Sequence, residues 1–379
     1  MSYSIVKPYY YSGNMKIDFP CKPDDLESKP DFNICMERIY AWYNQEIIDR
    51  IPVRFTAHNA EYNEAVALTG YSWKNLKERW FDTEYQLDLF EYKLKHSTFN
   101  AETFPVFWPN LGPEVFTAFY GVELDYREVT SYSIPSIKSW DQLDEIKLDF
   151  NNPYFRKLEE ITFEALKRCK GKYMVGYTDI HAGIDCAAAF RDPQQFCIDL
   201  IMEPEQAKKL IEISSRDFHT VYNHFDSILK SHNQLSVTWM GIPSYGKMHI
   251  PGCDFASMLS PEDFETFVLP SIKKEIAPMT HNIFHVDGKG VARHLDKILE
   301  LPEINAIQWV QGMGNDTPIM QWVPLIKKVQ SAGKSLVIDL KVSELEPFMN
   351  EVDPRGILLC IDADLNTQND ILRRVKKWK

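Results

Sequence analysis

Short apolar runs alternate with amphipathic segments along most of the chain. Nearly continuous apolar runs of this kind are typical of parallel strands that are buried on both faces. Eight such runs predict strands, at Ile51–Thr56, Phe104–Phe107, Tyr173–Thr178, Leu235–Met240, Asn282–Val286, Asn305–Val310, Ser335–Leu340 and Gly356–Ile361. Because helical segments separate the runs, the pattern predicts an α/β fold of the (β/α)₈ TIM barrel type. Neither GxGxxG nor GxxxxGK(S/T) occurs, which disfavours a doubly wound open sheet.

The segments between the runs carry helix signals. Ser260–Pro261 and Thr317–Pro318 each place a hydroxyl before a proline, as in the first turn of a helix. We expect further helices from Phe32 to Ile48, from Pro204 onwards, and from Gly288 to Glu300, the last with a solvated His294. The first three gaps are long, so extra helices are predicted in the early βα loops. Residues 1–31 are predicted to form an N-terminal arm, and residues 32–379 the barrel.

Composition and charge narrow the classes of function. The 379 residues are 44% hydrophobic and 13% aromatic, which is more than a disordered chain carries. The net charge of −12, without a basic stripe, argues against nucleic-acid binding. No apolar run could cross a bilayer, no secretory leader is visible, and the seven Cys include no CxxC pair. We therefore expect a cytoplasmic protein that binds a small molecule and neither nucleic acid nor a membrane, with a homodimer left open.

The active site of a (β/α)₈ barrel lies at the carboxyl ends of the strands. There the sequence places aromatic, amide and carboxylate side chains that we predict to bind substrate: Trp108, Asn110, Tyr177, Trp239, Tyr245, Gln308, Trp309 and Asp339. Together they suit a flat or sugar-like ligand. For any single aromatic residue of this set, a plain core position is the alternative.

Two polar pairs carry the predicted catalytic chemistry. His285 and Asp287 are two residues apart at a strand end, so both side chains point the same way, and imidazole and carboxylate both bind zinc. Cys360 ends the last strand and completes a predicted metal site. The alternative is a helix cap at Asp287 and core positions for His285 and Cys360. Asp179 and His181 end the third strand and are predicted to orient the substrate or move a proton, or else to be solvated turn residues.

Several segments resemble the uroporphyrinogen decarboxylase superfamily over nearly the whole length after residue 32. They include Trp108–Pro109–Asn110–Leu111–Gly112–Pro113, Pro251–Gly252–Cys253–Asp254, His285–Val286–Asp287–Gly288 and Ala306–Ile307–Gln308–Trp309–Val310. The chain looks most similar to the corrinoid methyltransferase-like, or trimethylamine corrinoid protein-like, branch. The Arg-rich motif with which the decarboxylases grip substrate carboxylates is replaced by Arg54–Phe55–Thr56–Ala57–His58–Asn59, which disfavours a tetrapyrrole substrate.

The resemblance implies a (β/α)₈ barrel that moves a methyl group between a corrinoid, free or on a small carrier protein, and a small acceptor. Methyltransferases of the superfamily use zinc, held by a His-x-Cys motif and a second Cys near the last strand, to activate a thiol. His285 matches the His, Asp287 stands in place of the first Cys, and Cys360 lies near the second. Two other functions stay open: a lyase or decarboxylase acting on a small polar or sugar-like substrate, and a non-catalytic ligand-binding barrel.

Overall fold

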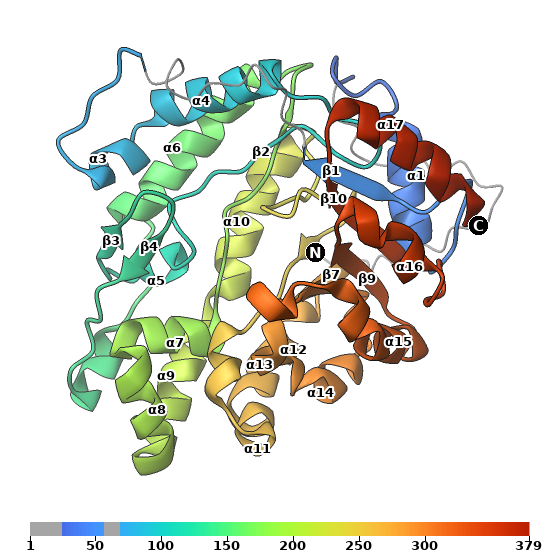
Figure 1. The fold of residues 1–379 in the computed structure, drawn as a ribbon. Coiled ribbons are helices and arrows are strands. Elements are labelled where there is room, and N and C mark those ends of the chain that lie inside the picture. Colours follow the sequence, from blue (N-terminus) through green and yellow to red (C-terminus); the bar gives the residue numbers. More distant parts are fainter. Residues whose placement is uncertain (1–24, 57–68, 379) are drawn as a thin grey trace, which may run out of the picture.

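A curved parallel sheet forms the centre of the molecule (Figure 1). The structure is a computed structural model that describes residues 25–56 and 69–378. The sheet contains β1 Val53–Thr56, β6 Met248–His249, β7 His281–Asp287, β8 Ala306–Val310, β9 Ser335–Asp339 and β10 Ile357–Asp362. Its strand order is β1-β10-β9-β8-β7-β6, and all neighbours are parallel. The middle strands are buried on both faces, as their continuous apolar sequences predict.

A second parallel sheet has two strands, β2 Val106–Phe107 and β5 Met174–Val175. Backbone hydrogen bonds extend beyond both sheets: Glu102 N donates to Val53 O at 3.0 Å, and Tyr177 N donates to Val237 O at 2.9 Å. Seven of the eight predicted runs contain a strand. Within the described residues, however, the strands form two parallel sheets and not the single closed eight-stranded sheet that the sequence predicts.

The fourth predicted strand, Leu235–Met240, is wrong. Ser236 and Ser244 exchange backbone hydrogen bonds in an isolated antiparallel bridge, and Gly241 N donates to Thr238 O across a tight turn. Gly241 has φ +66°, a left-handed conformation that favours glycine. The segment therefore folds back on itself, and β6 lies further along the chain.

One helix covers the amino-terminal end of the sheet. Trp42, on α1 Phe32–Tyr43, donates its Nε1–H to the carbonyl oxygens of Leu336 and Gly356 at 3.2 and 2.9 Å, where β9 and β10 begin. The helix stops before the predicted Ile48 because Gln45 turns to φ +57°. The opposite end of the sheet, where the strands finish, is left for the site.

Helices fill the loops, and the insertions between the early strands are long, as predicted (Figure 1). Between β1 and β2 lie α3 Leu76–Trp80 and α4 Thr83–Lys95; between β2 and β5 lie α5 Val115–Ala118, the hairpin β3 Leu124–Tyr126 and β4 Ser131–Ser133, and α6 Pro153–Arg168. Between β5 and β6 lie α7 Gly183–Arg191, α8 Pro193–Met202, α9 Pro204–Arg216 and α10 Phe218–Ser231. Later helices are α11 Pro261–Asp263, α12 Leu269–Ile276, α13 Gly288–Ala292, α14 Leu295–Leu299, α15 Val323–Ser331, α16 Leu345–Met349 and α17 Leu365–Arg374. No described helix is both long enough and apolar enough to cross a bilayer.

The structure confirms some of the predicted helix starts and divides one predicted helix into two. Helix α9 begins at Pro204, and Ser260 Oγ accepts a hydrogen bond from Asp263 N at 3.1 Å, so these two predicted starts are confirmed. The start predicted at Thr317–Pro318 is wrong: a 3₁₀ helix without a side-chain cap follows at Ile319–Trp322, and α15 begins at Val323. The predicted helix over residues 288–300 divides into α13 and α14 at His294, which is buried and not solvated. Its ring stacks on Phe264 at 4.4 Å, so a tertiary contact holds it inside.

Candidate active site at the carboxyl ends of the strands

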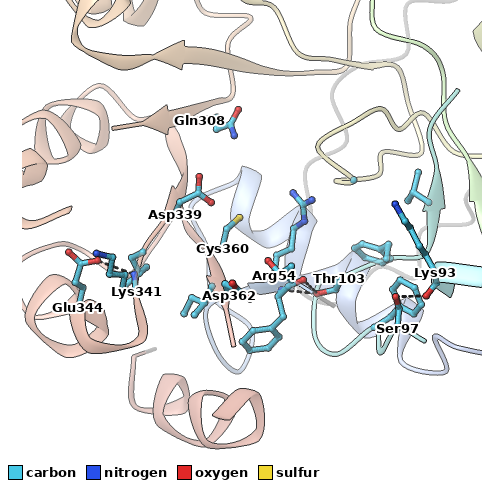
Figure 2. Close-up of a pocket in the computed structure, with 18 of the residues that line it drawn as sticks. Arg54, Lys93, Ser97, Thr103, Gln308, Asp339, Lys341, Glu344, Cys360 and Asp362 are labelled. Atoms are coloured by element: carbon cyan, nitrogen blue, oxygen red, sulfur yellow. Dashed lines mark hydrogen bonds between the residues drawn. The ribbon is translucent and has the colours of Figure 1, made fainter. Parts of the chain in front are cut away.

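A pocket of about 580 Å³ opens at the carboxyl ends of β1, β8, β9 and β10. Figure 2 shows Arg54, Cys360, Asp339 and Gln308 facing the same space from these four strands. Residues that are paired across parallel strands point to the same face of the sheet. Arg54 is paired with Cys360, and Cys360 is paired with Asp339, so the register alone sets these three side chains in a row.

The row Arg54–Cys360–Asp339 carries a cation, a thiol and a carboxylate. Burial raises the pKa of Cys360 to about 12; the charge of Arg54 opposes this shift and that of Asp339 adds to it. Burial also raises the pKa of Asp339, and Arg54 again opposes the shift. Cys360 is therefore a neutral thiol near pH 7, and the ionisable groups directly beside it are Arg54 and Asp339.

Beside this pocket, Gln308 determines which ring nitrogen of His285 carries a proton. The Nδ1 of His285 lies 2.7 Å from the Oε1 of Gln308, its register partner on β8. An amide oxygen only accepts hydrogen bonds, so His285 carries its proton on Nδ1. The neutral ring then has a free lone pair on Nε2, the atom that can bind a metal or accept a proton.

His285 and two carboxylates form a cluster of three side chains that can bind a metal. One ligand atom each from Asp254, His285 and Asp287 lies within 4.8 Å of the other two. His285 and Asp287 come from the end of β7, while Asp254 follows a segment that runs alongside β7. There Gly252 forms a parallel bridge with His285, and His285 N donates to Pro251 O at 2.8 Å. The spacing of two residues on a strand and this local pairing together build the cluster.

Cys360 is not part of this cluster, contrary to the prediction of a site made by His285, Asp287 and Cys360. Strands β8 and β9 lie between β7 and β10 in the sheet order, so Cys360 faces the pocket from the far side. Asp254 takes the place that the sequence assigned to the thiol. The resulting donor set has one imidazole nitrogen and two carboxylates.

Asp179 and His181 lie together after β5, as predicted. The Nε2 of His181 is 3.0 Å from a carboxylate oxygen of Asp179. Burial works against the charged ring, but the attraction and the hydrogen bond of Asp179 outweigh it and raise the pKa of His181 to about 10. His181 is therefore protonated at neutral pH and can donate a proton but cannot accept one.

A second pocket, of about 360 Å³, lies between His181 and the cluster of Asp254, His285 and Asp287. His181, Asp185 and Asp254 line it together. Asp185 accepts the backbone N–H groups of Asp254 and Phe255 at 3.1 and 2.9 Å. Burial, followed by the negative charge of Asp254, raises the pKa of Asp185 to about 6. Asp254 thus faces the second pocket, while Gln308 links His285 to the first.

Of the aromatic residues predicted to line the site, Trp239 lies beside the cluster, with its ring perpendicular to that of His285 at 5.5 Å. Trp309 does not line the site: it is fully buried and packs edge-on against Trp322 at 4.9 Å. Adjacent residues on a strand point to opposite faces, so Gln308 faces the pocket and Trp309 the surrounding helices.

Tyr245 also lies elsewhere, because the loop at residues 241–247 runs back to the amino-terminal end of the sheet. Its ring packs on Tyr40 of α1 at 5.6 Å. Tyr177 is buried in the wall, where its hydroxyl donates to Met248 O at 2.9 Å.

Trp108 and Asn110 lie in the loop that follows β2. Asn110 accepts the backbone N–H of Gly112 at 2.7 Å. The Nε1 of Trp108 is buried without a hydrogen-bond partner among the described residues. Neither residue is among those that line the two pockets.

Asp254 and Asp185 are the site residues that the sequence predictions missed. Asp254 ends the segment Pro251–Gly252–Cys253–Asp254, whose proline and glycine mark a turn just after β6. An acid after such a turn is a weak signal, because only the pairing of Gly252 with His285 brings it to the cluster.

Comparison with known proteins finds similarity in structure but none in sequence. No family model matches the sequence, and no curated protein does. Among solved structures, a methyltransferase from Methanosarcina mazei is similar, with a TM-score of 0.59 and 12% sequence identity over 90% of this chain and 98% of that chain. The chain therefore has a methyltransferase-like α/β fold.

Proposed function

We propose that this protein is a methyltransferase that moves a methyl group between a corrinoid and a small acceptor. The observation that carries the proposal is the convergence of Asp254, His285 and Asp287 within 4.8 Å, beside two pockets at the carboxyl ends of the strands. The fold shared with a solved methyltransferase supports the reaction class. We also propose that the two sheets belong to one (β/α)₈ arrangement, in which the segment around Val237 fills the place of the fourth strand.

The three clustered residues fit a divalent cation such as zinc. Zinc sites in proteins accept imidazole and carboxylate donors, and catalytic sites keep three protein ligands and one open position. Gln308 adds the outer hydrogen bond that orients a ligating histidine, with His285 Nε2 left free. A cation held by Asp254, His285 and Asp287 would lower the pKa of a thiol or hydroxyl acceptor bound beside it.

The surrounding residues position the substrates. Protonated His181, held by Asp179, supplies a hydrogen-bond donor to the second pocket. Trp239 covers one side of His285 and excludes water there. The corrinoid, free or on a small carrier protein, is proposed to reach the cluster from this carboxyl-end face.

Metal content and methyl transfer test the proposal together. We expect the purified protein to hold about one zinc ion per chain, and the variants Asp254→Asn and His285→Ala to lose it. Cys360→Ala is the matched control and should keep its zinc, because Cys360 lies outside the cluster. Transfer from methylcobalamin to a thiol, followed by the cobalamin spectrum, should occur in the wild type and fail in the first two variants. A protein without bound metal and without transfer to any thiol would contradict the proposal.

A further inference from the structure

The pocket of about 580 Å³ presents opposite charges on neighbouring strands. Arg54 on β1 and Asp339 on β9 flank Cys360 on β10, and each pair is in register. Strands lie about 4.8 Å apart, so the two Cα atoms are roughly 10 Å apart and the side chains reach into the space between them. Figure 2 shows Arg54 and Asp339 on either side of the Cys360 thiol.

Neither charge is neutralised by a salt bridge within the described part of the chain. The carboxylates and cations that form salt bridges there include neither Arg54 nor Asp339. Arg54 instead contacts the Cys360 thiol, and Asp339 contacts the same thiol from the other side. Arg54 is half-buried, and Asp339 is exposed at the end of β9. Because neither has an ionic partner, both can bind a ligand that supplies an opposite charge to each.

The other charged groups facing the pocket are differently placed. The carboxylate of Glu344 already accepts the backbone N–H groups of Ile319 and Lys341 at 3.0 and 2.9 Å. Lys341 and Asp362 lie two residues beyond Asp339 and Cys360, so they stand further out, at the edge of the pocket. Lys93 comes from α4 on the opposite wall. The interior of the pocket is thus dipolar, with one guanidinium and one carboxylate facing each other across a thiol.

We infer that this pocket binds the small acceptor and that the acceptor is a zwitterion, with its carboxylate on Arg54 and its ammonium group on Asp339. The inference rests on the proposed function and names its acceptor class. A planar guanidinium matches a carboxylate with two parallel hydrogen bonds, and a carboxylate accepts from ammonium. Gln308 lines the same pocket and contacts His285, so the remainder of the ligand would extend towards the cluster.

A ligand with a single charge should bind less tightly than a zwitterion, because one of the two pocket charges would stay unpaired. A ligand with only a carboxylate would satisfy Arg54 and leave Asp339 unpaired, and a ligand with only an ammonium group would do the reverse. Hydrogen bonds to charged groups contribute enough that losing one costs about tenfold or more in affinity.

Titration calorimetry with matched probes tests this directly. Propionate is alanine without the ammonium group, and ethylamine is alanine without the carboxylate. We expect alanine to bind at least about tenfold more tightly than either monoion, with and without a chelator for the metal. Arg54→Gln and Asp339→Asn should each lose this preference, while folding is checked by thermal unfolding.

The variant Lys341→Gln is the matched control, because it removes the same charge as Arg54→Gln at the exposed edge of the same pocket. It should change alanine affinity by no more than about twofold, since Lys341 lies two residues beyond Asp339 and outside the row of Arg54, Cys360 and Asp339, where salt screens its charge. Alanine that binds no better than propionate, or variants at residues 54 and 339 that bind like the wild type, would overturn the inference.

The inference and the proposed function fail in different ways. Methyl transfer to cysteine, 3-mercaptopropionate and cysteamine at equal efficiency would refute the zwitterionic acceptor and leave the methyltransferase intact. Charge-dependent binding of alanine without any methyl transfer would support the pocket assignment and contradict the reaction.

Discussion

Replacing Gln308 by leucine should weaken metal binding without touching a metal ligand. Gln308 is 9% exposed, and its Oε1 lies 2.7 Å from His285 Nδ1. Leucine keeps most of the volume but cannot accept the proton. His285 then has a buried N–H without a partner, and its ring can rotate or move the proton to Nε2, where the proton would compete with a metal.

Two independent estimates give the size of the effect. A buried donor that loses its acceptor costs about 1–3 kcal/mol. Outer hydrogen-bond partners of ligating histidines change metal affinity by about 10- to 100-fold, which corresponds to about 1.4–2.7 kcal/mol. The estimates agree, so we expect Gln308→Leu to weaken zinc binding by about 10- to 100-fold.

Competition with a chromophoric chelator measures this change. Gln308→Glu is the matched variant, because it keeps an acceptor oxygen at the same position and should bind zinc at least as tightly as the wild type. His285→Ala provides the limit in which the ligand itself is lost. Zinc affinity that is unchanged in the leucine variant but lost in His285→Ala would refute the role assigned to Gln308.

Three further predictions concern a buried histidine, the ion pair after β5 and a close backbone contact. Burial lowers the pKa of His281 to about 4, so stability should be complete above its ordinary pKa of 6.5 and fall by about 3 kcal/mol towards pH 4, where the unfolded chain binds the extra proton. Urea unfolding should show this pH dependence in the wild type and much less of it in His281→Gln; equal dependence would contradict the assignment. In Asp179→Asn, nuclear magnetic resonance titration should find the pKa of His181 well below about 10, since the largest attraction is lost while burial still opposes the charge and only the more weakly acting Asp185 and Asp254 favour it; a value still near 10 would exclude Asp179 as the main cause. Gly176→Ala would place a Cβ 2.6 Å from the carbonyl oxygen of Val237, and should lower the free energy of unfolding by about 1–3 kcal/mol; an unchanged value would show that the backbone yields without cost.

Local sequence patterns predicted five of the six strands of the main sheet, all except β6. The apolar runs between residues 282 and 361 became β7 to β10, because their residues have no polar face to present to water. The alternation of side chains along a strand also placed His285 and Asp287 on one face. The same alternation, applied to Gln308 and Trp309, would have excluded Trp309 from the pocket.

The sequence by itself determined where β1, β2, β5 and β7 to β10 lie, from their apolar runs, and which side chains share a face, from the period of two residues along a strand. Only the tertiary structure decided which residues meet across the chain. It brought Asp254 to His285 through a bridge to β7, set Cys360 between Arg54 and Asp339, and carried Tyr245 to the other end of the sheet. These outcomes depend on sheet order and register, which arise from packing between distant segments and leave no local pattern in the sequence.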